Sequence, residues 1–102
     1  MDDLLLKAKQ TLSIIPTATA KDEEIKTLIN AAVLDMQRQG IIVTIPENEE
    51  SEESMNDLVV CTIMMFVKGN FGNVEIKEKE LAQRTYKLLC TNLSLSNTYN
   101  ED

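Results

Sequence analysis

The sequence predicts a small all-α protein, a bundle of about four helices with an acidic loop between the second and the third. Apolar residues recur at steps of three and four over several stretches, which is the period of an amphipathic helix. The 102 residues and the 43% hydrophobic fraction suit one domain with a real core. We assign residues 1–96 to this helical domain and residues 97–102 to a flexible tail, because the last residues are almost all polar.

The first helix is expected to begin at a cap formed by Asp2 or Asp3 and to run to about Leu12. Pro16 stops it, because proline cannot continue a helix. One face of this helix is apolar. Its members are Leu5, Ala8 and Leu12.

The second helix has the strongest signals in the chain. Thr19 is expected to cap it, acidic residues fill its first turn where the helix dipole favours anions, and Gly40 supplies a left-handed stop. The acidic residues are Asp22, Glu23 and Glu24. The predicted apolar stripe is Ile25, Leu28, Ile29, Ala32, Val33 and Met36.

An acidic segment separates the second helix from the third. Ile41, Val43 and Ile45 precede it, and we expect them to pack as an extended segment against the core. The acidic loop contains Glu47, Glu49, Glu50, Glu52 and Glu53. With Asp57 it carries nearly all of the net charge of -7. It is either a solvated loop or an electronegative surface that DNA slides past without sticking.

The third helix is expected from an almost unbroken apolar run, from Leu58 to Val67. Ser54 and Asp57 resemble a capping box at its start, and it should end near Gly69 or Asn70. A helix that is apolar on nearly every side must be covered all round by other protein. Subunit contacts are therefore expected to cover it.

The fourth helix is expected to be capped by Asn73. Its predicted apolar face is Leu81, Thr85, Leu88, Leu89 and Leu93. Cys61 and Cys90 lie within the third and fourth helices, and both are interpreted as small buried hydrophobes.

The sequence favours no enzyme, cofactor or metal site. It has no histidine, which is the commonest general base and metal ligand, and no glycine-rich phosphate loop. Glu23 and Glu24 open a helix as in helical magnesium-dependent nucleotide pyrophosphohydrolases, but Thr27 stands where a later Glu is expected. Gly69 and Gly72 are interpreted as helix termination and tight turning.

Membrane and nucleic-acid partners are not expected either. The longest apolar run is about ten residues, whereas a span needs about twenty, and no secretory signal is expected at the start. The net charge is -7, so the chain is not expected to have the basic surface that binding to nucleic acids requires, whether to the backbone or to a specific sequence. A soluble protein of a reducing cytosol is the simplest expectation.

Two stretches of the sequence carry a family resemblance. They are Ile63-Met64-Met65-Phe66-Val67-Lys68-Gly69-Asn70-Phe71-Gly72 and Glu80-Leu81-Ala82-Gln83-Arg84-Thr85-Tyr86-Lys87-Leu88-Leu89, supported by Leu12-Ser13-Ile14 and Leu28-Ile29-Asn30-Ala31-Ala32. Together they resemble the head-tail connector family of tailed bacteriophages and prophages, also called adaptor, head-completion or DNA-packaging proteins. The chain departs from the family pattern at Phe66, where tyrosine is common, and in its longer acidic loop.

The resemblance implies a structural, non-catalytic subunit that joins a ring of about a dozen copies under the phage portal protein. The ring would extend the DNA channel, contact passing DNA only passively, and offer a docking surface to head-closure or tail-completion proteins. The protein would sit at the head-tail joint of the virion and pass through the host bacterial cytoplasm during assembly.

Six residues are candidates for structural or interface roles, namely Met64, Phe66, Lys68, Asn70, Phe71 and Tyr86. Ordinary core packing is the favoured interpretation of Phe71 and Tyr86, and bonding to helix-end carbonyls that of Lys68 and Asn70. An acidic helical regulator or DNA-mimic inhibitor is the alternative function, although its charge should be spread over the surface rather than gathered in one loop. The magnesium pyrophosphohydrolase is a weaker alternative.

Overall fold

The computed structural model describes residues 2–43 and 56–100. These residues form four helices, α1 (Asp2–Thr11), α2 (Asp22–Arg38), α4 (Asp57–Asn70) and α5 (Ile76–Asn100), and no strand. The expected all-α bundle is therefore confirmed. The five glutamates of the acidic loop lie outside the described residues, so its role stays a prediction. The expected domain end at residue 96 falls inside α5, and the flexible tail also stays a prediction.

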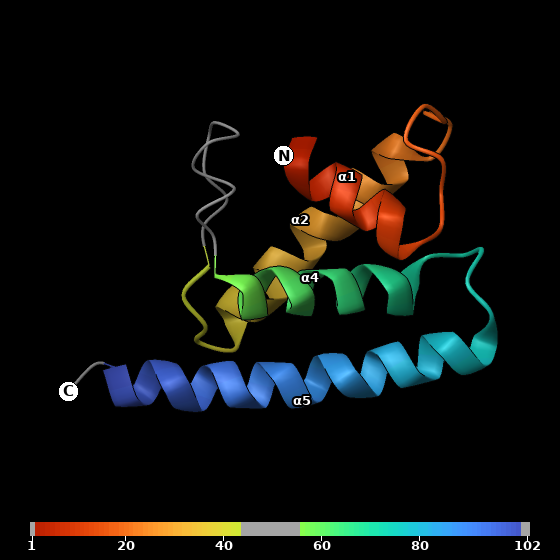
Figure 1. Cartoon of the computed structure of the whole chain (residues 1–102). Helices are drawn as coiled ribbons and strands as arrows, with labels where there is room; N and C mark the ends of the chain where they lie inside the picture. Colours follow the sequence, from red (N-terminus) through yellow and green to blue (C-terminus); the bar gives the residue numbers. More distant parts are fainter. Residues whose placement is uncertain (1, 44–55, 101–102) are drawn as a thin grey trace.

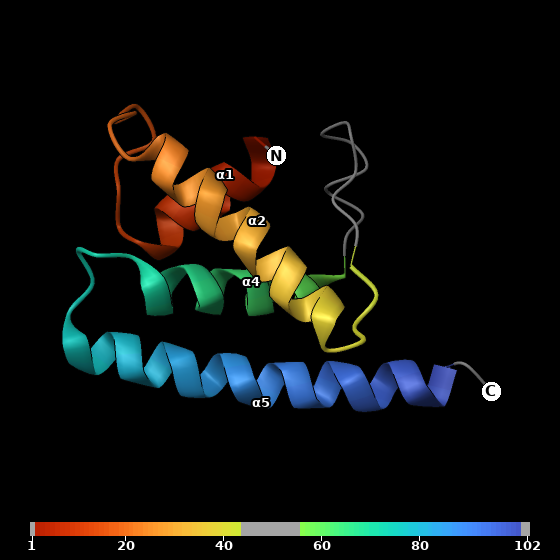
Figure 2. The same ribbon diagram turned by 180° about the vertical axis from the view of Figure 1, so that it is seen from behind.

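Helix α4 is the central element of the bundle. Helix α1 lies on one side of it, α5 lies antiparallel on the opposite side, and α2 crosses it obliquely (Figure 1, Figure 2). Its buried residues are Val60, Thr62, Ile63, Met64, Val67 and Gly69. Ile63 and Val67 have no exposed surface. Three helices of the same chain cover most of α4, but Leu58 and Cys61 remain exposed, so the expectation that neighbouring subunits cover that side stays a prediction.

The remainder of the core comes from α1 and α2. Leu4, Leu5 and Ala8 of α1 are buried against the stripe of α2, whose predicted members are all buried except Leu28, which is half-buried. Lys9 is also buried, and its Nζ lies 2.6 Å from Asp22 Oδ1 and donates to the Pro16 carbonyl at 3.1 Å. This ion pair fastens the end of α1 to the start of α2.

The segment after α2 packs inward as expected. Gly40 has a φ of 85°, which confirms the left-handed stop. Ile41 and Val43 are buried, and Gln37 Nε2 donates to the Val43 carbonyl at 2.7 Å. Ile45 lies outside the described residues.

Three predicted helix caps are not confirmed. Lys21, not Thr19, precedes α2, and its side chain makes no cap bond, because an ammonium group has no acceptor. Thr19 lies further back, where its carbonyl accepts a hydrogen bond from the Asp22 N–H at 3.1 Å. The cap of α4 is Asn56, whose side chain accepts a hydrogen bond from the Leu58 N–H at 2.8 Å, while Ser54 lies outside the described residues. Helix α5 begins at Ile76, after a turn that contains Asn73.

Helices α4 and α5 approach closely at Gly69. A Cβ added to Gly69 would lie 2.8 Å from Gln83 Cγ and 3.3 Å from the Gln83 backbone nitrogen. Gln83 Nε2 also donates to the Gly69 carbonyl at 2.7 Å. Helix α4 ends at Asn70, as expected, and Gly69 has a second role at the contact with α5. Its missing side chain lets α5 lie against α4.

Replacing Gly69 with alanine should destabilise the protein by about 1–2 kcal/mol. Overpacking costs about 1–3 kcal/mol, and the better helix propensity of alanine offsets up to about 1 kcal/mol of it. Urea unfolding of the free protein measures this difference. Gly72→Ala is the matched control, because an added Cβ there meets nothing within 4 Å. A Gly69→Ala variant as stable as the control would contradict the close approach.

Candidate interaction surfaces

Three of the six candidate residues belong to the interior. Met64, Phe71 and Tyr86 are buried in the core of the single chain, which confirms the packing interpretation of Phe71 and Tyr86. Phe66 is half-buried, with its ring edge-to-face on Tyr86 at a centroid distance of 5.2 Å. Asn70 Nδ2 donates to the Phe66 carbonyl at 2.8 Å, which confirms the interpretation of Asn70 as a helix-end residue.

A polar cluster around Tyr86 joins α2 to α5. The Tyr86 hydroxyl donates to Asp35 Oδ2 at 2.6 Å. Gln39 Nε2 donates to the same oxygen at 3.0 Å and lies 3.7 Å from Cys90 Sγ. Because Tyr86 and Cys90 are both on α5, the cluster fixes how that helix is rotated about its axis.

Burial of this cluster shifts two proton equilibria. Burial first, and then the hydrogen bond to Asp35, raises the pKa of the Tyr86 hydroxyl well above its ordinary value of 10.0. Burial also raises the pKa of the Cys90 thiol above 9.0, against the lowering effect of its hydrogen bonds. Both groups therefore keep their protons to a higher pH in the folded protein than in the unfolded chain.

The free energy of unfolding should fall as the pH rises above about 9–10. Both pKa values are higher in the folded state, so the unfolded chain loses these protons first and is favoured by alkaline conditions. The contribution of these two pKa shifts to the free energy of unfolding is fully present below about pH 9. Urea unfolding from pH 7 to pH 11 tests this, with Tyr86→Phe expected to reduce the alkaline slope. An unchanged slope in the variant would contradict the assignment to Tyr86.

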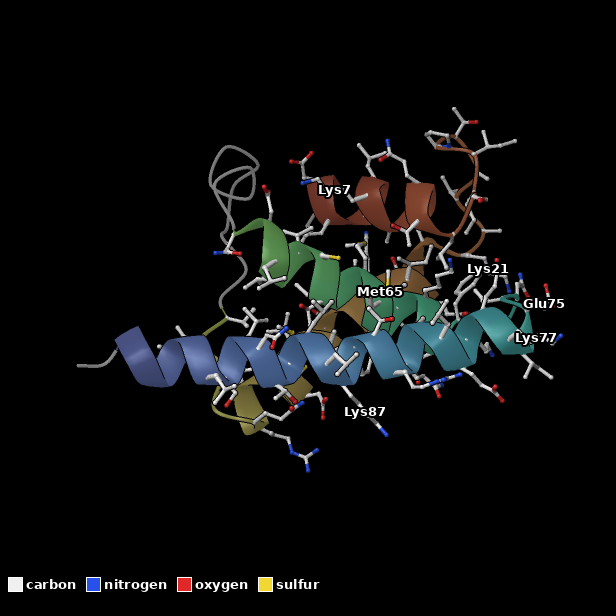
Figure 3. All side chains as sticks on the ribbon, turned by 60° about the horizontal axis from the view of Figure 1, so that its bottom comes forward. Lys7, Lys21, Met65, Glu75, Lys77 and Lys87 are labelled. Carbon is white, nitrogen blue, oxygen red and sulfur yellow. The ribbon has the colours of Figure 1, made fainter. Side chains whose placement is uncertain are left out.

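A groove lies where the end of α1 meets the turn between α4 and α5. It has a volume of about 480 Å³, and both Lys68 and Phe71 line it. The other lining residues are Thr11, Leu12, Ser13, Ile14, Asn73, Val74, Glu75 and Glu78. Two stretches of the family resemblance, around Ser13 and around Lys68, therefore meet at one place. Figure 3 shows Glu75 and Lys77 at this end of α5.

The buried face of α5 is not the predicted one. Ala82, Tyr86, Cys90 and Leu93 are buried, so Leu93 is the one fully buried member of the predicted stripe. Thr85 and Leu89 are half-buried. Two contacts fix the rotation of α5 about its axis so that the row of buried residues faces the core. They are the contact of Gln83 with Gly69 and the hydrogen bond of Tyr86 to Asp35. The sequence did not reveal this rotation, because both rows of residues have helical spacing.

A line of leucines remains on the outside of α5. Leu81, Leu88 and Leu95 are 62%, 68% and 59% exposed. They follow one another at steps of seven residues, or about two turns, so they share one helix face. We call these three residues the leucine line. Lys77 and Arg84 are exposed on the same face.

The described residues provide little for chemistry. Within residues 2–43 and 56–100, no cluster of three or more histidine, cysteine, aspartate or glutamate side chains is placed to hold a metal ion. None of the described helices is both long and apolar enough to cross a membrane. Cys90 is buried as expected, but Cys61 is exposed, because it lies on the side of α4 that the other helices leave open.

Comparison with known protein families decides the identity of the chain. The model of a family described as phage connector protein matches residues 4–100, which is nearly the whole chain. The chain belongs to the phage connector protein family. No curated protein and no solved structure matches it. The resemblance seen in the sequence is confirmed, and this connector is a bacteriophage protein of the virion that assembles with other head or tail proteins.

Proposed function

We propose that this connector is an adaptor subunit of the head-tail joint. About a dozen copies form a ring under the portal protein, extend the DNA channel and dock head-closure or tail-completion proteins. The observation that carries the proposal is the family match over residues 4–100. Assembly takes place in the host bacterial cytoplasm.

Packing within the chain supports this role. Because three helices of its own chain cover most of α4, we expect a free subunit to fold before it assembles. The outward faces of α2 and α5 then remain available for neighbours. An interface that uses two different faces of each subunit closes into a ring when the rotation per subunit is right. The leucine line gives one such face an apolar surface.

Charge and chemistry also fit a passive conduit. The net charge of -7 disfavours tight binding to phosphates, so DNA can pass the ring without being held. The absence of histidine removes the commonest acid–base catalyst. Both features support a structural, non-catalytic role.

Mixing the purified protein with its cognate portal tests the proposal. Electron microscopy of the mixture should show a ring added to one end of the portal, and the complex should sediment faster than the portal alone. The matched control is the portal of an unrelated phage, which should stay bare. A cognate portal that stays bare at every protein concentration would reject the adaptor role. Release of phosphate from nucleotides by the protein would reject the non-catalytic role.

A further inference from the structure

We propose that the leucine line of one copy packs against the outer face of α2 of the next copy, with the two helices parallel. This inference rests on the proposed ring and names the surfaces that build it. The partner is a second copy of this chain.

The outer face of α2 has the chemistry to receive the leucine line. Leu34 is 62% exposed at the centre of its C-terminal half. The neighbouring exposed residues at helical spacing on this face are Glu23, Thr27, Asn30 and Arg38. On this face, Leu34 thus lies between an acidic residue, Glu23, near the start of the helix and a basic residue, Arg38, at its end.

The spacing of charges on α2 matches that on α5. Glu23 precedes Leu34 by eleven residues, and Lys77 precedes Leu88 by eleven residues, which is about 16 Å along either helix. When Leu34 lies against Leu88 in parallel, Glu23 therefore lies opposite Lys77. The same register places the Thr27 methyl group opposite Leu81.

The antiparallel arrangement is disfavoured by charge. It would bring Arg38 opposite Arg84, since each lies four residues from the leucine at the centre. Like charges facing each other across an interface oppose binding, and rim charges set orientation more than affinity. Within α2, Glu23 forms an exposed ion pair with Lys26 at 3.8 Å. This pair is too weak to prevent Glu23 from pairing with Lys77 of the next copy.

The two faces also have the right relation within one copy. Helix α2 crosses α4 obliquely, whereas α5 runs along α4 (Figure 1, Figure 2), and Leu34 and Leu88 are both exposed in the same copy, so both faces are open at the same time. A contact between unlike faces repeats from copy to copy, whereas an α5–α5 contact uses the same face twice and ends at a dimer. A ring therefore requires a contact between two unlike faces, and the α2–α5 pairing provides one.

Cross-linking in the assembled ring tests the pairing. The background is Cys61→Ser, which removes the exposed thiol, while buried Cys90 is retained. The variant Leu34→Cys with Leu88→Cys should give a ladder of covalent oligomers on mild oxidation when bound to the portal. Either single variant should give no ladder. A double variant that forms rings without cross-links, or a Leu88→Cys single variant that cross-links to dimers, overturns the pairing.

A charge exchange tests the parallel register. Lys77→Glu should weaken ring assembly by about tenfold, because it faces Glu23 of the next copy, and adding Glu23→Lys should restore it. Assembly that is not restored in the double variant overturns the register. If the unsubstituted protein forms no ring with its portal, the proposed function fails instead, so the two failures are distinguishable.

Discussion

Replacing Leu88 with aspartate should abolish assembly on the portal while leaving the free subunit folded. Leu88 is exposed in the free chain, so the stability of the monomer should change by no more than about 0.5 kcal/mol. At a contact between copies, the same carboxylate is buried without a partner. A loss of about 3 kcal/mol per contact weakens binding about a hundredfold, and a ring repeats the loss at every contact. Sedimentation with the portal measures this loss.

The control for this experiment is Ile15→Asp. Ile15 is as exposed as Leu88 but lies in the loop between α1 and α2 and belongs to neither of the two proposed helix faces. It should assemble as the unsubstituted protein does. Assembly that survives Leu88→Asp, or that both variants lose equally, would contradict a specific role for the leucine line.

Replacing Ile63 with alanine should destabilise the free subunit by about 2–5 kcal/mol, because it leaves a cavity in the middle of the core. Ile63 lies on α4 with no exposed surface, in contact range of helices on both sides. Leu88→Ala, on the open face of α5, should change the stability by less than about 0.5 kcal/mol. Urea unfolding at two protein concentrations checks both values.

The comparison of Ile63→Ala with Leu88→Ala also tests whether the hydrophobic core is complete within one chain. The unfolding midpoint of Ile63→Ala should not depend on protein concentration, since Ile63 is fully buried within a single chain. A loss of less than about 1 kcal/mol, or a midpoint that rises with concentration, would show that α4 is covered only in an assembly.

The helices could be predicted from the sequence because their signals are local. The stripe of α2 and its stop at Gly40 depend on residues within one or two turns of each other. How the helices cover one another is not local. The apolar run of α4 predicted that it would be buried, but it could not show that α1, α2 and α5 bury it within one chain.

The rotation of α5 was the main feature that the sequence could not reveal. Its two rows of residues have similar spacing, and the choice between them depends on contacts with distant residues, Gly69 of α4 and Asp35 of α2. The rotation of α5 also decides which of its leucines are exposed on the surface. Of the six candidates for structural or interface roles, Met64, Phe71 and Tyr86 are core residues, in agreement with the packing interpretation of Phe71 and Tyr86. Leu88, by contrast, was placed on the apolar face of the fourth helix and is exposed.

The most direct test of the central claim is a reconstruction of the portal with this connector attached, at a resolution that separates helices. The account predicts a closed ring in which the outer face of α5, with Leu88 at its middle, lies against α2 of the adjacent subunit in parallel. A ring in which the leucine line faces solvent or the DNA channel, with α2 unpaired, would contradict it.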